Sequence, residues 1–112
     1  MEPACDLSSN QCKPRAGGVQ PLSQPEADSL MKQLEGWQQH DNLIGKTYRF
    51  KNYYQTISSD NAIAWMAHRE DHHPNLSVAY DSCRVEYSTH AINGLSENDF
   101  ICAAKADALF KS

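Results

Sequence analysis

The sequence contains no long hydrophobic run. In 112 residues, no apolar stretch approaches the roughly 20 residues that a membrane-spanning helix requires. The first residues, MEPACDLSSNQCKPRAGG, also lack the apolar stretch of a secretion signal. We therefore expect a soluble, cytoplasmic protein that makes no contact with a membrane.

The sequence also lacks a cluster of basic residues. Its 10 Lys and Arg are scattered along the chain and are outnumbered by 14 Asp and Glu, which gives a formal charge of -4. Nucleic-acid-binding domains normally carry a concentrated basic footprint. The composition therefore argues against direct binding of nucleic acid.

Cysteine is present, but without the spacing of a metal site or a disulfide framework. Cys5, Cys12, Cys83 and Cys102 include no CxxC pair. We interpret them as reduced thiols, with Cys83 and Cys102 as small core residues. A metal-binding knuckle at Cys5 and Cys12 is the alternative. Both lie in residues 1–21, which show no hydrophobic period and are expected to be loosely ordered.

The remaining residues, 22–112, are expected to form a single domain that begins with a helix. Ser23 and Glu26 have the spacing of a capping box, and Pro25 suits the first helical turn. Apolar residues continue at helical spacing to Leu34, and Gly36 is the expected end of the helix.

A hairpin and a second helix are expected next. The strand-like runs GWQQH and LIGKTYRF are separated by Asp41-Asn42, a pair that suits a tight turn. Asn52 is a candidate helix cap, and the helix after it is expected to run to about Asp71. Pro74 prevents it from continuing further.

The last third of the chain predicts a second hairpin and a third helix. The runs LSVAY and CRVEYST alternate in polarity around Asp81-Ser82, and His90 falls where the second strand ends. The final helix is expected from SEND to about Phe110, with Ala108 among its core-facing residues.

This order of elements, α-β-β-α-β-β-α, predicts an α+β fold. Two hairpins most simply form a four-stranded antiparallel sheet, and the three amphipathic helices need one common apolar surface. We therefore expect all three helices on one face of the sheet. The other face is left to solvent or to contacts in an oligomer.

The stretch AHREDHHPNLSV holds three of the five histidines, and their pattern has more than one interpretation. His68 and His72 are four residues apart, so a helix would place them on one face as a metal-binding pair. The third ligand is missing, however, and HREDH lacks the glutamate of HExxH, so we predict no metal. Histidine is also favoured at helix C-termini for its charge, which would explain His72 without any chemistry.

The chemical interpretation is an acid-base cluster of His72, His73 and His90. Imidazole exchanges protons near neutral pH, which suits general acid-base catalysis. Pro74 turns the chain directly into the hairpin whose far end carries His90, so a single hairpin can bring the three together. Asp99 has two compatible interpretations, as part of a capping box in the last helix and as a group that orients a histidine.

These residues resemble the pattern of the pterin-4a-carbinolamine dehydratase family. The paired histidines of HHP begin at His72, His90 follows eighteen positions later, and GLSEND places Asp99 nine positions further on. GW at residues 36–37 and YRFKNY at residues 48–53 also match. The resemblance spans about residues 22–107.

The resemblance implies loss of water from a 4a-hydroxytetrahydropterin to give the quinonoid dihydropterin. This reaction recycles tetrahydrobiopterin for aromatic amino acid hydroxylases and needs no cofactor. Because a sheet with helices on one side leaves a face or edge to cover, we also expect a homodimer or homotetramer. The residues that match His72 and His90 handle the proton of the leaving hydroxyl, and His73 mainly holds the substrate beside Pro74. Asp99 supports the site.

The sequence departs from the family pattern at two positions. Family members often carry an acidic residue four positions before the first histidine, where this chain has His68 as a supporting residue. Glu70 and Asp71 are close in sequence but are expected to point elsewhere. Leu76 replaces an aromatic residue that could cover the pterin in some relatives.

A non-catalytic binding protein on the same fold is the alternative function. The resemblance includes dimerisation cofactors of a homeodomain transcription factor and assembly factors without activity. A chain that had lost catalysis would be free to lose His72, His90 or Asp99. All three are present, and we therefore predict an enzyme.

Overall fold

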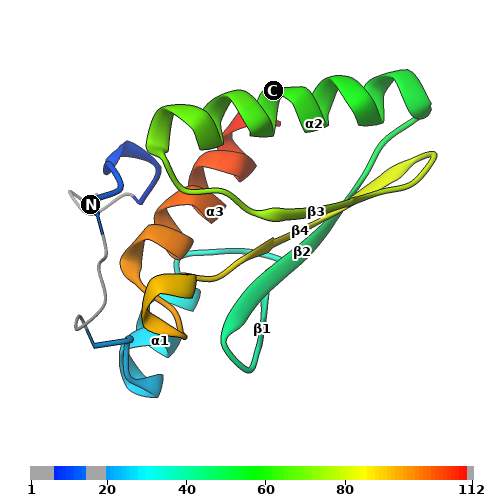
Figure 1. Ribbon diagram of the computed structural model, residues 1–112. Helices are drawn as coiled ribbons and strands as arrows, with labels where there is room; N and C mark the ends of the chain where they lie inside the picture. Colours follow the sequence, from blue (N-terminus) through cyan, green and yellow to red (C-terminus); the bar gives the residue numbers. More distant parts are fainter. Residues whose placement is uncertain (1–6, 15–19, 111–112) are drawn as a thin grey trace.

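The computed structural model describes residues 7–14 and 20–110. Within these ranges it contains three α-helices and a four-stranded antiparallel sheet, which confirms the predicted order of elements (Figure 1). None of its helices is long and apolar enough to cross a membrane. The elements in chain order are η1 (Leu7–Ser9), α1 (Gln24–Met31), β1 (Gln38–His40), β2 (Leu43–Arg49), α2 (Tyr53–Glu70), β3 (Asn75–Val78), β4 (Ser82–Tyr87), η2 (His90–Ile92) and α3 (Glu97–Leu109).

The predicted helix starts are confirmed by side-chain caps. The Ser23 hydroxyl accepts from the Glu26 backbone N–H, and the Glu26 carboxylate accepts from the Ser23 backbone N–H, which completes a capping box. The Asn52 side chain accepts from the Gln55 N–H and begins α2.

The predicted end of the first helix is wrong. Helix α1 ends at Met31, well before Gly36, which has a positive φ of 84° in the following loop. The N–H groups of Gln33 and Leu34 bond to carbonyls three residues back, which tightens the chain into turns. Leu34 therefore packs against the core from a turn instead of from a helix.

The sheet has the strand order β1-β2-β4-β3, and its buried side chains lie on one face. Ile44 pairs with Tyr87 and Tyr48 pairs with Cys83, and directly paired residues share a face. These four side chains, together with Val85, belong to the hydrophobic core, which also includes residues of the three helices. The opposite face carries polar side chains, as the alternation in CRVEYST predicts.

Two details of the last third differ from the prediction. The turn of the second hairpin is centred on Tyr80 and Asp81, because the Ala79 N–H bonds to the Ser82 carbonyl. Ala108, expected to face the core, is exposed. It lies two residues after the buried Ala106, which is about 200° around the helix and hence on the opposite side.

Residues 7–14 pack against α3, in contrast to the loose ordering expected for residues 1–21. Leu7 is only 4% exposed and joins the core. The Lys105 ammonium on α3 donates to the Ser8 carbonyl at 2.9 Å. Cys5 and residues 15–19 lie outside the described residues, so the interpretation of Cys5 stays a prediction.

Candidate active site

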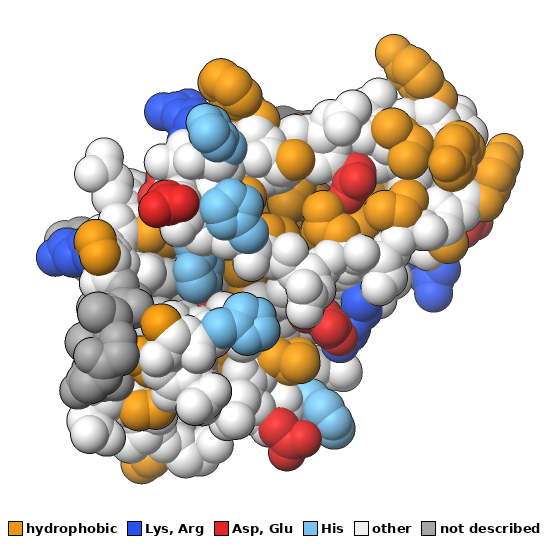
Figure 2. Space-filling model, in the orientation of Figure 1, with side chains coloured by type: hydrophobic (Ala, Val, Ile, Leu, Met, Phe, Trp, Pro, Cys, Tyr) orange, Lys and Arg blue, Asp and Glu red, His pale blue; other side chains and the backbone are white. Residues whose placement is uncertain are grey.

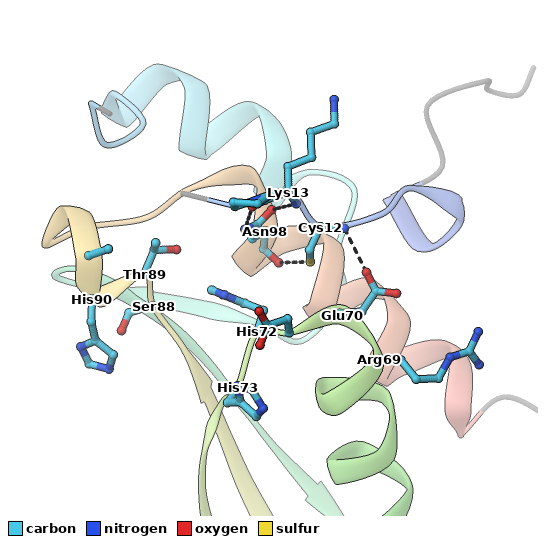
Figure 3. A pocket seen from close by; sticks show the side chains of 13 residues that line it. Cys12, Lys13, Arg69, Glu70, His72, His73, Ser88, Thr89, His90 and Asn98 are labelled. Atoms are coloured by element: carbon cyan, nitrogen blue, oxygen red, sulfur yellow. Dashed lines mark hydrogen bonds between the residues drawn. The ribbon is translucent and has the colours of Figure 1, made fainter. Parts of the chain in front are cut away.

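A cavity of about 620 Å³ opens where α2 and β4 end, beside residues 12–14 (Figure 3). This volume is typical of small-molecule sites. Histidine side chains gather on this face of the molecule (Figure 2). The lining residues are Cys12, Lys13, Pro14, Arg69, Glu70, Asp71, His72, His73, Ser88, Thr89, His90, Ala91 and Asn98. The three histidines predicted to cluster are therefore brought together.

The end of helix α2 turns His72 toward the cavity. The helix stops at Glu70, and Asp71 adopts a left-handed conformation with φ 52°. The His72 N–H then bonds to the Ala67 carbonyl and the Asp71 N–H to the His68 carbonyl, which is a Schellman motif. His72 is therefore two residues past the helix, so it does not share a helix face with His68 as the metal-pair interpretation would require.

His72 is paired with a buried carboxylate. Its Nε2 lies 2.7 Å from Oδ1 of Asp99, whose side chain is completely buried. The other carboxylate oxygen accepts from the Thr89 hydroxyl at 2.8 Å and the Ser96 N–H at 2.9 Å. The Ser96 bond confirms the predicted capping box of α3. Asp99 is thus both a cap and the orienting partner of a histidine.

The environment of His72 fixes the orientation of its ring. The imidazole is stacked on the buried Tyr87 ring, with centroids 5.9 Å apart and an interplanar angle of 8°. Because a carboxylate can only accept, the bond to Asp99 places the N–H on Nε2. This leaves Nδ1 of His72 to exchange a proton with a bound molecule.

His73, which directly follows His72, and His90, from a separate segment, complete the cluster. His73 belongs to the connection between α2 and β3, and His90 begins η2, a short helix that the sequence did not predict. A bridge between Thr89 and Gly94 closes the loop that holds η2. Both imidazoles are exposed, and Figure 3 shows them with His72 around one open region.

Four neighbouring residues are placed differently from the prediction. His68 is exposed on α2 and does not line the cavity, and Pro74 is also absent from its lining. Glu70 and Asp71 were expected to point elsewhere, but both line the cavity. For Asp71 the reason is its own left-handed conformation, which ends the helical geometry at that residue.

The sequence did not identify one wall of the cavity. Asn98 on α3 holds this wall through two bonds to Lys13: its side-chain oxygen accepts from the Lys13 N–H at 3.0 Å, and its amide donates to the Lys13 carbonyl at 2.6 Å. The Cys12 N–H donates to the Glu70 carboxylate at 2.9 Å (Figure 3). These residues are far apart in sequence, and no local pattern could have revealed their contact.

No cluster of three or more metal-ligating side chains occurs among the residues that the structure describes. With His68 turned away from His72, the i, i+4 pair considered from the sequence does not form. Independence from metal stays a prediction.

A second carboxylate on α3 makes a separate polar cluster. Asp107 accepts from the Lys46 ammonium at 2.9 Å, the Tyr48 hydroxyl at 2.5 Å and the Trp37 indole N–H at 3.1 Å. Burial and the hydrogen bond to Asp107 raise the pKa of Tyr48 well above its ordinary value. This cluster joins the sheet to α3 and contains no histidine.

Two solved structures share the fold of this chain. A Brucella melitensis protein, described as a transcriptional coactivator/pterin dehydratase, matches with a TM-score of 0.76 and 30% identity. The match covers 80% of this chain and 97% of that one. A pterin dehydratase-like protein, described as a RuBisCO assembly factor in the alpha-carboxysome, matches with a TM-score of 0.57 and 23% identity, over 68% of this chain and 88% of that one. The second likeness shows the fold alone.

Curated relatives extend the similarity to the whole chain. A Nitrosomonas europaea protein, provisionally named pterin-4-alpha-carbinolamine dehydratase, is 66% identical over 100% of both chains. A Nitrosospira multiformis protein with the same provisional name is 59% identical over 95% of this chain and 94% of its own. Residues 20–109 match the family described as Pterin 4 alpha carbinolamine dehydratase. The cavity with its paired aspartate and histidine is thus that of a family member, and the chain belongs to the pterin 4 alpha carbinolamine dehydratase family.

Proposed function

We propose that this protein is an enzyme, a dehydratase that removes water from a 4a-hydroxytetrahydropterin and releases the quinonoid dihydropterin. The observation that carries the proposal is the buried Asp99 bonded to His72 at the cavity, with His73 and His90 beside it. A carboxylate-oriented imidazole is a common arrangement for general acid-base chemistry. The family to which the chain belongs supports the choice of a pterin.

The reaction needs one proton delivered and one proton removed. The bond between C4a and oxygen breaks with its electron pair on oxygen, and a protonated imidazole supplies the proton that turns the leaving hydroxide into water. A ring nitrogen of the pterin loses its proton to a neutral imidazole, and its electrons form the new double bond. No oxidation or reduction occurs, so the balance requires no redox cofactor.

The histidines divide this work according to their positions. His72, whose orientation is set by Asp99 and Tyr87, and His90, on the loop that follows β4, exchange the protons. The hydroxyl can stand on either face of the pterin ring, so each histidine suits one stereoisomer. His73 mainly holds the substrate.

Stopped-flow measurement of a freshly generated 4a-hydroxypterin tests the proposal. We expect dehydration to be much faster with the protein than without it, at catalytic protein concentrations. If the rates are the same, the alternative of a non-catalytic binding or assembly role takes the lead. The Brucella melitensis protein is described as a transcriptional coactivator as well as a pterin dehydratase, so a non-catalytic binding role is the second candidate.

The cellular setting is part of the same proposal. The product of this reaction is the form from which tetrahydrobiopterin is regenerated, and the chain would serve an aromatic amino acid hydroxylase in the cytoplasm. A homodimer or homotetramer would cover the edge strands β1 and β3 and the exposed Val78 and Tyr80. Light scattering at micromolar concentration tests this, and a monomer mass would contradict it.

A further inference from the structure

One wall of the cavity is built from a segment outside the region that matches the family. We call residues 7–14 the N-terminal strap; the family match begins at residue 20. The strap is held by the bonds from Cys12 to Glu70 and from Lys13 to Asn98, and by the buried Leu7. It is therefore docked on α2 and α3 through contacts that are mostly made by its own backbone.

The strap also brings two thiols together. The sulfur atoms of Cys12 and Cys102 lie 3.3 Å apart, although the residues are 90 positions apart in sequence. Cys12 is half-buried at the wall of the cavity, and Cys102 is completely buried in α3. A disulfide has a sulfur-sulfur distance of about 2.05 Å, so bond formation requires an approach of only about 1.3 Å. Cys83 is on β4 and contacts Asp60 instead.

We propose that Cys12 and Cys102 form a reversible disulfide that fixes the strap as a wall of the cavity. The pair has the arrangement of a redox site, because the Cys12 sulfur is accessible from the cavity and the Cys102 sulfur lies buried next to it. The hydrogen bond to Cys12, together with burial, raises the pKa of the Cys102 thiol above its ordinary value. Cys12 is accordingly the sulfur that reacts first.

The oxidant is a small peroxide that enters through the cavity. The Cys12 thiol loses its proton, the thiolate attacks one oxygen of hydrogen peroxide and the O–O bond breaks. The leaving hydroxide takes up that proton, so a sulfenic acid and water result. The Cys102 sulfur, losing its proton, then attacks the Cys12 sulfur, and the S–O bond breaks to release a second water. Two thiols and one peroxide give one disulfide and two waters. A dithiol reductant reverses the bond by exchange.

The disulfide has a functional consequence that rests on the proposed function. When the thiols are reduced, the strap can leave α3 and open the wall formed by residues 12–14. When the thiols are oxidised, the disulfide holds this wall in place. Pterin binding then no longer carries the entropic cost of ordering residues 12–14. Oxidised protein should therefore bind a pterin severalfold more tightly than reduced protein.

Peptide mapping tests the bond directly. The protein is treated with hydrogen peroxide, alkylated and digested with trypsin in a Cys5→Ser background, so that the peptide of residues 1–15 keeps only one thiol. We expect a product 2 Da lighter in which this peptide is linked to that of residues 85–105, and the Cys83→Ser variant should give the same product. Free, alkylatable Cys12 and Cys102 after treatment would overturn the proposal, as would a link to Cys83.

Thermal unfolding provides a readout that does not depend on activity. A bridge closing a loop of this length should raise the melting temperature by roughly 10 °C, and the rise should disappear with reductant and in Cys12→Ser. Cys102→Ala serves as a second variant if Cys12→Ser alters the strap. A melting temperature that does not respond to peroxide would contradict the stabilising role.

Fluorescence titration with an oxidised, unreactive pterin tests the effect on the cavity. We expect severalfold tighter binding after peroxide treatment in wild type and no response in Cys12→Ser. Equal affinity in both redox states, with the mapped bond present, would overturn the effect on the wall. If no pterin binds in either state, the proposed function fails, whereas the mapped bond and the thermal shift stand independently.

Discussion

Helix α3 carries two aspartates that each accept three hydrogen bonds, but the two ends of the helix use them differently. Asp99, in the first turn, is completely buried and its ionic partner is His72. Asp107, in the last turn, has a side chain that is 19% exposed and its ionic partner is Lys46. Asp99 therefore bonds to a histidine that lines the cavity, whereas Asp107 links α3 to the sheet.

The ionic partner of each aspartate indicates whether that aspartate is suited to chemistry or to structural stabilisation. An ammonium keeps its charge throughout the neutral range, so the pair of Asp107 and Lys46 is a permanent link. An imidazole can act as an acid or as a base, so the pair of Asp99 and His72 is suited to proton transfer. The type of acidic residue therefore does not identify the active site, whereas its partner and the adjoining cavity do.

The strongest test of this comparison is removal of His72 and His90, the two histidines that we propose transfer protons. His72→Ala and His90→Ala should each lower kcat by about 10²–10⁴-fold, because a positioned acid or base typically contributes that much. Each single variant should keep residual turnover biased toward one stereoisomer, and the double variant should be inactive. Stopped-flow dehydration of each stereoisomer gives the measurement.

A folded double variant with wild-type turnover would mean that the histidine cluster is structural. Circular dichroism establishes that the variants are folded. In that case, the two ends of α3 would not differ in function, and the binding-protein alternative would replace the enzyme.

Matched aspartate substitutions sharpen the comparison directly. In Asp99→Asn the amide oxygen must serve Thr89 and Ser96, so the amide NH₂ faces Nε2 of His72 and favours the wrong tautomer. We expect kcat to fall by roughly 10²-fold. Asp107→Asn should instead lower the free energy of unfolding by about 1–3 kcal/mol and leave kcat unchanged.

Steady-state kinetics and urea unfolding of both variants check this contrast. The comparison fails if Asp107→Asn loses as much turnover as Asp99→Asn, or if Asp99→Asn loses stability alone. A changed pH profile of kcat in Asp99→Asn is the signature that a merely structural role would not produce.

Substitution of the third histidine should have a smaller effect. His73→Ala should raise KM by about 10-fold with little change in kcat, because a residue that holds the ground state and the transition state alike contributes to binding and not to the chemical step. His68→Ala is the matched control, since His68 is exposed on α2 and does not line the cavity. Initial-rate kinetics distinguish the two, and equal KM values would remove His73 from substrate binding.

The smallest effect concerns Tyr48, which donates to Asp107 in the last turn of α3, and it appears only at alkaline pH. Burial and Asp107 raise the pKa of Tyr48, so above about pH 10 its phenol ionises in the unfolded chain but not in the folded one. Its contribution to stability is therefore complete below that pH and is lost as the pH rises. The free energy of unfolding should therefore fall less steeply with pH in Tyr48→Phe, by up to about 1.4 kcal/mol per pH unit.

Urea unfolding between about pH 8 and about pH 11 measures this slope. Tyr54→Phe is the control, because Tyr54 is 80% exposed and should leave the slope unchanged. The decline should persist in part, since burial also raises the pKa of Tyr87, and burial raises that of Cys83 to about 11. An unchanged slope in Tyr48→Phe would contradict the prediction.

Much of the fold could be predicted because its signals are local. A cap residue and the backbone N–H that donates to its side chain are three residues apart, as at Ser23 and Asn52, and the alternation in β4 repeats every two residues. The end of α1 was missed because tertiary packing of Leu34 favours turns over the last helical turn that Gly36 suggested. The motif of HHP, His90 and Asp99 indicated the family for the same reason, since it is read directly from spacing.

The sequence by itself determined the caps, the hairpins and the identity of the histidines, because each depends on neighbours a few residues away. The tertiary structure decided which groups those residues meet. His72 and Asp99 are 27 positions apart, Lys13 and Asn98 are 85 apart, and Cys12 and Cys102 are 90 apart. Such contacts depend on how α2, α3 and the N-terminal strap pack together. Apolar periodicity indicates which face of each element is buried, but it does not indicate which distant residue that face meets.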